Sequence, residues 1–531
     1  MSSDGEPASL GTKSLPSLPE GWCWAKVSDV GEVKLGRQRS PEHHNGPHMR
    51  PYLRVANVFE DRIDLSDVLE MNFTPDEYQV YRLQPGDVLL NEGQSLELVG
   101  RPAMYHDELP GACFQNTLVR FRAKPGVDPA YALLIFRYYL HSQRFQRIAK
   151  WTVNIAHLGA QRFAEIEFPL APTNEQRRIV AKIDELFSDL DAGVASLERA
   201  KAKLKRYRAS VLKAAVEGRL TEQWRAVNPP KETASQLLER ILSERRHRWE
   251  EEQAAACAKA AKKPPANWRQ KYKEPVGPDE SNLAALPEGW CWASVQQVGR
   301  VQLGRQRSPK HHVGPHMRPY LRVANVFEDR IDISDVMEMN FTPAEYEVYR
   351  LQHGDILLNE GQSMELVGRP AVYRDEVPGA CFTNTLVRFQ CSRDLDPEYA
   401  LAVFLTYLKN GRFQKIATIT VNIAHLGAGR FSELEFPLPP YEEQRQIVAE
   451  VKRQLSIIQA LESQIEATEK RSSRLRQSIL KSAFEGRLVA QDPRDEPASA
   501  LLERTSAQPR ANRARLEQPK RPSPLRKRGH A

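Results

Sequence analysis

The sequence predicts a mixed α/β protein, with two similar globular domains and two long helices that pair as an antiparallel coiled coil. Three observations support this prediction: two stretches with a helical repeat of apolar residues, an internal repeat of most of the chain, and short strand-like runs inside each repeat. Two units of one type in a single polypeptide commonly behave as a fused homodimer, so we expect a pseudo-twofold axis between them.

The first apolar stretch predicts a long helix over residues 173–220. Its apolar residues recur at spacings of three, four and seven, which is typical of a helix with one apolar seam. Thr173 and Gln176 fit a capping box, and Gly218 fits a left-handed C-terminal cap. Roughly 43 helical residues span about 65 Å, so the helix cannot bury its seam without a partner. The seam comprises Ile179, Ile183, Leu186, Leu190, Val194, Leu197, Leu204, Tyr207, Val211 and Ala215.

The partner is a second stretch of the same kind over residues 441–488. The closing glycines, Gly218 and Gly486, are 268 positions apart (486 − 218), and this offset holds without a gap from residue 18 to residue 220. Residues 35–60 and 303–328 differ at only two of 26 positions. We favour antiparallel over parallel pairing, because the connection must leave the end of the first helix and enter the second domain. The second seam comprises Ile447, Val451, Leu455, Ile458, Leu461, Ile465, Leu475, Ile479 and Ala483.

The repeat also predicts the order of the segments along the chain. In the first domain, residues 52–56, 86–90 and 117–121 predict strands, and residues 128–140 predict a helix capped by Asp128. The predicted segments are a disordered leader (1–17), the first domain (18–172), the first long helix (173–220), a helical connection and linker (221–285, helix over 234–251), the second domain (286–440), the second long helix (441–488) and a basic disordered tail (489–531).

Composition and missing motifs exclude most enzyme classes. The net charge of +8 permits a polyanionic partner without requiring one. No run approaches 18 apolar residues and the N-terminus lacks a signal-peptide pattern, so we expect no membrane span. The six cysteines lack metal-ligand spacing, and we interpret them as reduced thiols in a cytoplasmic protein. The sequence has no phosphate loop, dinucleotide fingerprint, GxSxG or HExxH motif, so we expect neither catalysis nor a cofactor or metal in this chain.

Polar loops in each domain are suited to DNA. Arginine can form two hydrogen bonds with guanine, glutamine can do so with adenine, and serine can bind a phosphate. Each residue alone also fits a turn or a cap, but three such loops on one small domain favour a reading surface. The predicted DNA-binding residues are Arg37, Gln38, Arg39, Ser40, Arg54, Asn57, Asn91, Gln94, Ser95, Arg101 and Asn116, with Asn154 and His157 as further candidates, and in the second domain Arg305, Gln306, Arg307, Ser308, Arg322, Asn325, Asn359, Gln362, Ser363, Arg369 and Asn384.

The whole pattern resembles the specificity subunit of type I restriction-modification systems over nearly the full length. The resemblance implies two target-recognition domains, and two conserved helices that pair antiparallel, in a subunit without catalysis. It also implies double-stranded DNA, two adenine-N6 methyltransferase subunits and motor-nuclease restriction subunits as partners, with S-adenosylmethionine, ATP and Mg on those partners. The residues that carry it are 169–176 and 437–444 at the helix starts, 210–218 and 478–486 at their ends, and Trp249, 262–265, Trp268 and 272–275 in the connection.

The chain departs from this family in one respect, since the two recognition domains are usually unlike and here are nearly identical. We therefore predict a bipartite target with near-identical inverted halves across a nonspecific gap. A stand-alone symmetric DNA-binding regulator is the main alternative, and it would bind its site tightly without partners. The missing motifs disfavour an all-in-one nuclease or methyltransferase, and the polar loops disfavour a pure scaffold. The main differences between the domains are Trp151/Ile419, Asn45/Val313 and Gln161/Gly429.

Overall fold

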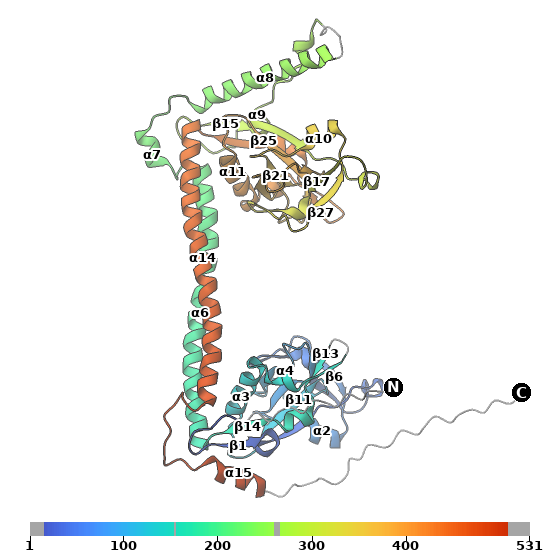
Figure 1. Cartoon of the computed structure of the whole chain (residues 1–531), viewed down its shortest axis with the longest axis vertical. Helices are drawn as coiled ribbons and strands as arrows, with labels where there is room; N and C mark the ends of the chain where they lie inside the picture. The colour runs from blue at the N-terminus through green and yellow to red at the C-terminus, as the bar shows by residue number, and fades with distance from the viewer. Residues whose placement is uncertain (1–14, 153–154, 260–265, 508–531) are drawn as a thin grey trace, which may run out of the picture. The chain divides into compact units, whose positions relative to one another are not determined.

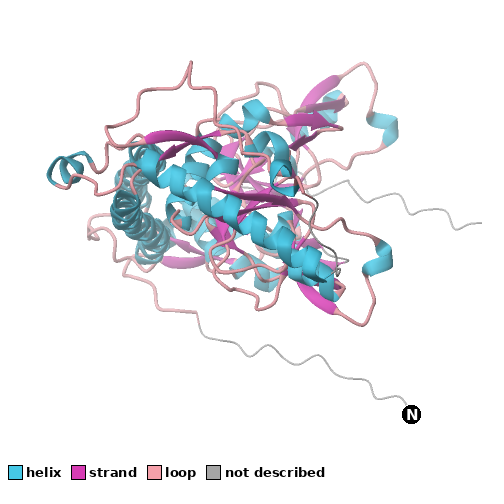
Figure 2. Ribbon diagram, turned by 90° about the horizontal axis from the view of Figure 1, so that it is seen from above, coloured by secondary structure: helices cyan, strands magenta, loops and turns pink. Residues whose placement is uncertain are grey.

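The computed structural model describes residues 15–152, 155–259 and 266–507. Internal contacts divide the chain into two units, Met1–Ser196 with Ala467–Ala531, and Leu197–Glu466 (Figure 1). Each unit holds one domain that mixes helices and strands (Figure 2). Asn154, residues 262–265, and most of the predicted leader and tail lie outside the described residues. Among the helices of the described ranges, none is long and apolar enough to cross a membrane.

The first domain consists of short strands packed against helix α3 (Pro129–His141). Its strands are β1 (Cys23–Lys26), β2 (Gly31–Leu35), β3 (Met49–Leu53), β4 (Val58–Phe59), β5 (Arg62–Ile63), β6 (Leu69–Asn72), β7 (Val88–Asn91), β8 (Gly93–Gln94), β9 (Pro102–Met104), β10 (Cys113–Phe114), β11 (Leu118–Ala123), β12 (Lys150–Thr152), β13 (Ile155–His157) and β14 (Glu167–Leu170). The central sheet is antiparallel in the order β2-β11-β7-β9, and a mixed sheet has the order β10-β3-β6. Smaller pairings join β1 to β14, β4 to β5, and the hairpin β12–β13 to β8.

The central sheet is buried on both faces. Along β7, Val88 and Leu90 join the apolar core beneath α3, whereas Leu89 between them joins a second core that contains Phe114. This alternation follows from the pleat of a strand, which directs successive side chains to opposite faces. Helix α3 begins where the sequence predicts it, because the Asp128 carboxylate accepts a hydrogen bond from the Ala130 N–H (2.9 Å).

The other helices of the first unit are short, except for its parts of two long helices that it shares with the second unit. They are α1 (Val27–Val30), α2 (Pro75–Tyr81), α4 (Arg144–Ile148), α5 (Ala160–Ala164), α15 (Ala498–Ala507) and parts of α6 (Thr173–Val216) and α14 (Tyr441–Phe484). The start of α6 and the end of α14 bury Ile179, Ile183, Ile479 and Ala483 in the same core as the domain. Helix α15 packs Leu501 into that core, and the Ala498 N–H donates to the Gly21 carbonyl (2.8 Å).

The second domain repeats this architecture. Its central sheet has the order β16-β25-β21-β23, and the mixed sheet has the order β20-β17-β24. Its elements are β15 (Cys291–Ser294), α9 (Val295–Val298), β16 (Gly299–Leu303), β17 (Met317–Leu321), β18 (Val326–Phe327), β19 (Arg330–Ile331), β20 (Met337–Asn340), α10 (Pro343–Tyr349), β21 (Ile356–Asn359), β22 (Gly361–Gln362), β23 (Pro370–Val372), β24 (Cys381–Phe382), β25 (Leu386–Cys391), α11 (Pro397–Lys409), α12 (Arg412–Ile416), β26 (Thr418–Thr420), β27 (Ile423–His425), α13 (Ala428–Ser432) and β28 (Glu435–Leu438).

The second unit also contains the end of α6, the start of α14, and the helices α7 (Glu222–Val227) and α8 (Ala234–Lys259). Val211 and Ala215 of α6 share the domain core with Ile447 and Val451 of α14. Arg208 forms an ion pair with Glu462 (3.0 Å) between the same two helices. Helix α8 buries its first turns against the domain through Ala234, Leu237 and Ile241.

Several features differ from the sequence predictions. The strand expected over residues 52–56 ends at Leu53, because Asn57 caps a tight turn by accepting the Arg54 N–H (3.0 Å). Gln176 does not close a capping box. Its side chain instead accepts from the Asp128 N–H and donates to the Ala171 carbonyl (2.8 Å each), which fastens the domain to α6. Gly218 adopts φ +68°, the predicted left-handed cap.

Two predicted extents are also corrected. The predicted disordered tail begins too early, since α15 is a helix whose apolar residues the domain buries. The predicted linker helix over 234–251 extends to Lys259. Within the predicted seams, Tyr207, Leu461 and Leu475 are exposed, because one neighbouring helix covers only part of a helix surface.

Glu175 provides a pH-dependent test of how the first unit is held together. It lies in the first turn of α6 and accepts a hydrogen bond from the Trp22 indole (3.0 Å). Burial raises the pKa of its carboxyl above the ordinary value, and only the Trp22 bond and nearby positive charge oppose this. The folded pKa therefore exceeds the unfolded pKa, so stability is lost as the pH rises from the unfolded pKa through the folded one.

We expect Glu175→Gln to raise the unfolding temperature of the first unit at neutral pH. The substitution keeps an oxygen to accept the Trp22 bond and removes the cost of a buried charge. The measurement is differential scanning calorimetry between about pH 4.5 and pH 7.5, over which the gain should grow. Glu443→Gln, at the matching position of the second repeat, is the control that should lower stability. A gain that is independent of pH would contradict the explanation.

Candidate nucleic-acid interface

The predicted polar loops of the first domain converge on one turn, Gln115–Thr117. The Asn116 N–H donates to the Arg37 carbonyl (3.0 Å), and the Gln115 N–H donates to the Leu53 carbonyl (3.0 Å). The Thr117 hydroxyl accepts from the Val55 N–H (3.1 Å), and its carbonyl accepts from the Glu92 N–H (2.9 Å). Segments that begin at residues 36, 54 and 91 are thus gathered at one end of the central sheet.

The same turn organises the second domain. The Asn384 N–H donates to the Arg305 carbonyl (2.9 Å), and Thr385 accepts from Val323 (3.1 Å) and Glu360 (2.9 Å). Gln115 is replaced by Thr383, which pairs with Arg305 in the same parallel bridge. The two domains therefore build their loops with the same main-chain contacts.

The first loop requires glycine because two backbone segments meet there. A Cβ on Gly36 would lie 2.2 Å from the Gln115 carbonyl oxygen, and one on Gly304 would lie 2.2 Å from that of Thr383. No side chain fits at such a distance, so residue 36 and its repeat position must be glycine for the loop to approach the turn. Beyond this contact, Gln38 and Arg39 point outward and are exposed, as are Gln306 and Arg307.

Arg37 lies inside the domain rather than on the predicted reading surface. Its guanidinium is buried, donates from Nε to Glu77 (2.8 Å) and lies 5.1 Å from the ring centre of Phe73. Glu77 also belongs to the capping box of α2 with Thr74. Arg305 makes the same contacts with Glu345 and Phe341. Both arginines are buried and hold the helix that follows β6 or β20, through the glutamate of its capping box.

Two asparagines in each domain are likewise buried. The Asn57 amide donates to the carbonyls of Asp64 and Asp67 (2.9 Å each), and Asn325 does the same with Asp332 and Asp335. Asn91 and Asn359 lie at the ends of buried strands, with no exposed surface. Sequence patterns alone do not separate these internal asparagines from surface ones, because both occur in loops next to strands.

The remaining candidates are half-buried or exposed, and their DNA contact stays a prediction. Arg54 pairs with Asp67, and Arg101 donates to the Val58 carbonyl (2.6 Å) beneath the surface. Burial lowers the pKa of the Arg101 guanidinium. The Ser40 hydroxyl donates to Glu42 (2.9 Å). Gln94, Ser95 and Asn116 are partly exposed, and so are Ser308, Arg322, Gln362, Arg369 and Asn384; Ser363 is exposed.

The hairpin next to the second loop contains the further candidate His157, together with exposed apolar side chains that are not among the predicted DNA-binding residues. Strand β13 pairs with β8, so the hairpin β12–β13 lies beside Gln94. It exposes Trp151 (57%) and Ile155, and the hairpin β26–β27 exposes Ile419 (64%) and Val421 (95%). His157 contacts Glu92 (2.9 Å) and joins the hairpin to the loop. Proteins that bind the minor groove frequently insert apolar side chains between base steps.

Val421 marks the hairpin of the second domain as strained. Its φ is +44°, and that of the following Asn422 is +65°. Positive φ at two central residues is the pattern of a tight hairpin turn, which asparagine tolerates and a β-branched residue resists. Among the described residues, His/Cys/Asp/Glu side chains form no group of three that could hold a metal ion.

Comparison with known proteins places these domains in a family. The model of the type I restriction modification DNA specificity domain matches residues 19–202 and again residues 319–472. The specificity subunit of the type I restriction enzyme EcoKI from Escherichia coli K12 is 25% identical over 518 residues, which cover 93% of this chain and 97% of that protein. The StySPI specificity subunit from Salmonella potsdam is 25% identical over 512 residues, covering 92% and 96%.

The fold also agrees with a solved structure. A chain solved for the complex assembly and conformational transition of the type I R-M system aligns with a TM-score of 0.60 at 17% identity, over 89% of this chain and 100% of that one. This likeness concerns the fold. Because the family model covers more than half of the sequence and matches both repeats, the chain belongs to the family of type I restriction-modification DNA specificity subunits.

Proposed function

We propose that this chain is the non-catalytic subunit that selects the DNA target of a type I methyltransferase and restriction complex, and that its target has two near-identical inverted halves. The observation that supports the symmetry is the shared loop architecture. Both domains gather their loops on the same turn and expose the same pair, Gln38–Arg39 and Gln306–Arg307. Two equal reading surfaces are expected to bind two equal half-sites.

The two long helices support a proposed antiparallel coiled coil with a pseudo-twofold axis. In one unit the start of α6 packs against the end of α14, and in the other the end of α6 packs against the start of α14. Such a pair would hold the two reading surfaces at a fixed spacing and set the gap between the half-sites.

The same helices are the proposed docking surface for two adenine-N6 methyltransferase subunits, and through them for restriction subunits. Tyr207, Ile457, Leu461 and Leu475 leave apolar side chains exposed along them. Exposed apolar stretches on helices are suited to further helices from a partner. In this proposal S-adenosylmethionine, ATP and Mg²⁺ bind the partner subunits.

Methylation-sensitive sequencing of the host genome, with and without the gene, tests the proposal. We expect deletion to remove N6-methyladenine from one bipartite motif with identical inverted halves. Loss from a motif with unlike halves would retain the recognition role and contradict the symmetry. An unchanged methylome, together with tight binding of the isolated chain to one DNA site, would instead favour a stand-alone regulator.

A further inference from the structure

A cavity of about 800 Å³ lies between α8 and the second domain, within a single unit of the chain. Helix α8 forms one wall, the start of β16 and the end of β25 form the opposite wall, and the linker residues Lys271–Lys273 close one side. In Figure 1, α8 lies on the α9 side of this domain, and β27 lies on the far side. The cavity is therefore separate from the predicted reading loops.

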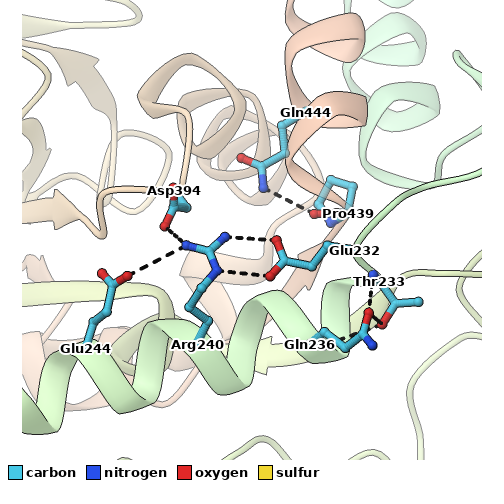
Figure 3. A network of polar contacts seen from close by, with 8 residues as sticks. All are labelled: Glu232, Thr233, Gln236, Arg240, Glu244, Asp394, Pro439 and Gln444. Carbon is cyan, nitrogen blue, oxygen red and sulfur yellow. Dashed lines mark hydrogen bonds and ion pairs between the residues drawn. The ribbon is translucent and has the colours of Figure 1, made fainter.

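Specific contacts build this cavity and fix α8 against the domain. Arg240 of α8 contacts Glu232, Glu244 and Asp394, the last of which belongs to the domain (Figure 3). One turn further along α8, Arg245 donates to the carbonyls of Gln296 and Gly299.

The far end of this wall is aromatic. The Trp249 ring stacks on Trp268 with centroids 5.8 Å apart, and it lies 5.3 Å from Tyr272. These contacts bring the linker back onto α8, so two aromatic side chains, Trp249 and Tyr272, line the cavity.

The lining is strongly basic. Eight lysine and arginine side chains line the cavity, against three glutamates. Within the described part of the chain, six of them form no ion pair to a carboxylate: Arg245, which donates to main-chain carbonyls, and Arg248, Lys271, Lys273, Arg300 and Arg393. Unpaired cations in a concave site concentrate positive potential, and a multiply charged anion relieves their mutual repulsion.

The internal repeat shows that the fold does not require this charge. Arg300 occupies the position of Glu32 in the first domain, where the Glu32 carboxylate accepts from Arg120 (2.8 Å). In the second domain Arg388 replaces Arg120, donates to Gln302 and forms an ion pair with Asp355 (3.5 Å). Burial lowers the pKa of the Arg388 guanidinium, and the charge of Arg300 lowers it further against the opposing effect of Asp355. At the position of Arg300 the second domain therefore has a cation where its twin has a carboxylate.

The location separates this site from DNA reading. Arg300 lies at the start of β16, whereas the loop with Gln306 and Arg307 follows its end. The five residues of this strand span about 17 Å. A duplex bound to the loops therefore does not by itself occupy the cavity. The volume suits a small molecule rather than a duplex, and the aromatic wall suits a planar ring.

We propose that this cavity binds a free organic polyphosphate of the nucleoside triphosphate class. Its phosphates contact Arg300, Lys273 and Arg393, and its base lies against Trp249 and Tyr272. Among the described residues this site occurs once, since Lys271 and Lys273 of the linker have no counterpart in the described part of the C-terminal segment. Ligand binding thereby distinguishes the second domain from its otherwise near-identical twin.

Isothermal titration calorimetry of the full chain with ATP and with inorganic triphosphate tests the proposal. We expect both probes to bind, and Arg300→Glu, which introduces the residue of the twin position, to weaken both by at least about tenfold. Lys470→Glu, an equal charge reversal on exposed α14, is the matched control and should leave both affinities unchanged. Absence of binding at millimolar concentration, or equal effects of the two substitutions, would overturn the proposal.

Two further measurements distinguish a free nucleotide from a DNA backbone as the ligand. Trp249→Ala should weaken ATP more than inorganic triphosphate, because only ATP has a ring to contact the aromatic wall. Retained triphosphate binding shows that the variant keeps the cavity. If a nonspecific duplex displaces the triphosphate, and Arg300→Glu weakens duplex binding by the same factor, the cavity holds a DNA backbone and the assignment to a free polyphosphate fails.

Discussion

Replacing Arg39 and Arg307 together by alanine is expected to weaken binding to the cognate duplex by about a thousandfold. Both side chains are exposed, and each lies three positions (39 − 36 and 307 − 304) after the glycine that fixes the first loop against the central turn. An arginine paired with a base edge contributes about 1–3 kcal/mol of discrimination, and two distant sites add, which gives about 2–6 kcal/mol in total. Thermal unfolding should be unchanged, because surface substitutions away from internal contacts rarely alter stability.

Fluorescence anisotropy at fixed salt, with a duplex that carries the methylated motif and the full chain, measures this effect. Arg487→Ala removes one charge from an exposed residue after α14 and controls each single substitution for general electrostatics. Each single substitution should cost about half of the double effect in free energy if the half-sites are equal. Affinity within threefold of the unmodified chain would show that these arginines do not read DNA. Arg37→Ala makes an informative contrast, since it should lower stability through the lost contact with Glu77.

Glu443→Ala is expected to destabilise the second unit by about 3–5 kcal/mol, which corresponds to a fall of about 10 °C in its unfolding temperature. The buried carboxylate accepts from the Thr221 hydroxyl (2.7 Å), Arg225 (2.6 Å) and the Trp290 indole (2.9 Å). Removing it leaves three donors without their acceptor, one of them a half-buried charge. This one carboxylate joins α14, the segment after α6 and the domain.

The repeat supplies the matched control for this prediction. Glu175→Ala, at the corresponding position, removes the acceptor of one hydrogen bond, from the Trp22 indole, so its effect should be clearly smaller. The first unit uses Asp495 for part of the same task, through contacts with Arg178 (2.7 Å) and Asn174 (3.2 Å). Calorimetry that resolves the two units compares the variants directly. Equal losses for the two substitutions would contradict the assigned role of the Arg225 and Thr221 bonds.

The sequence by itself determined the repeat, the long helices and the family. Apolar spacing, the caps and the constant offset are local or periodic signals, and they require no knowledge of which segments meet. The cap at Gly218 and the start of α3 at Asp128 were predictable because each depends on residues a few positions away. The loops with Gln38 and Arg39 could be proposed as a site because they stand next to strand-like runs.

The tertiary structure decided which of the predicted side chains reach the surface. Arg37, Asn57 and Asn91 have the right chemistry for DNA, but their partners come from 7 to 40 positions away and bury them. The role of Gln176 and the exposed hairpins likewise depend on packing between distant segments. The basic cavity beside α8 depends on the fold in the same way, because its lining residues are spread from Ile241 to Arg393. Burial and long-range pairing are properties of the folded chain, and residue type and spacing do not encode them locally.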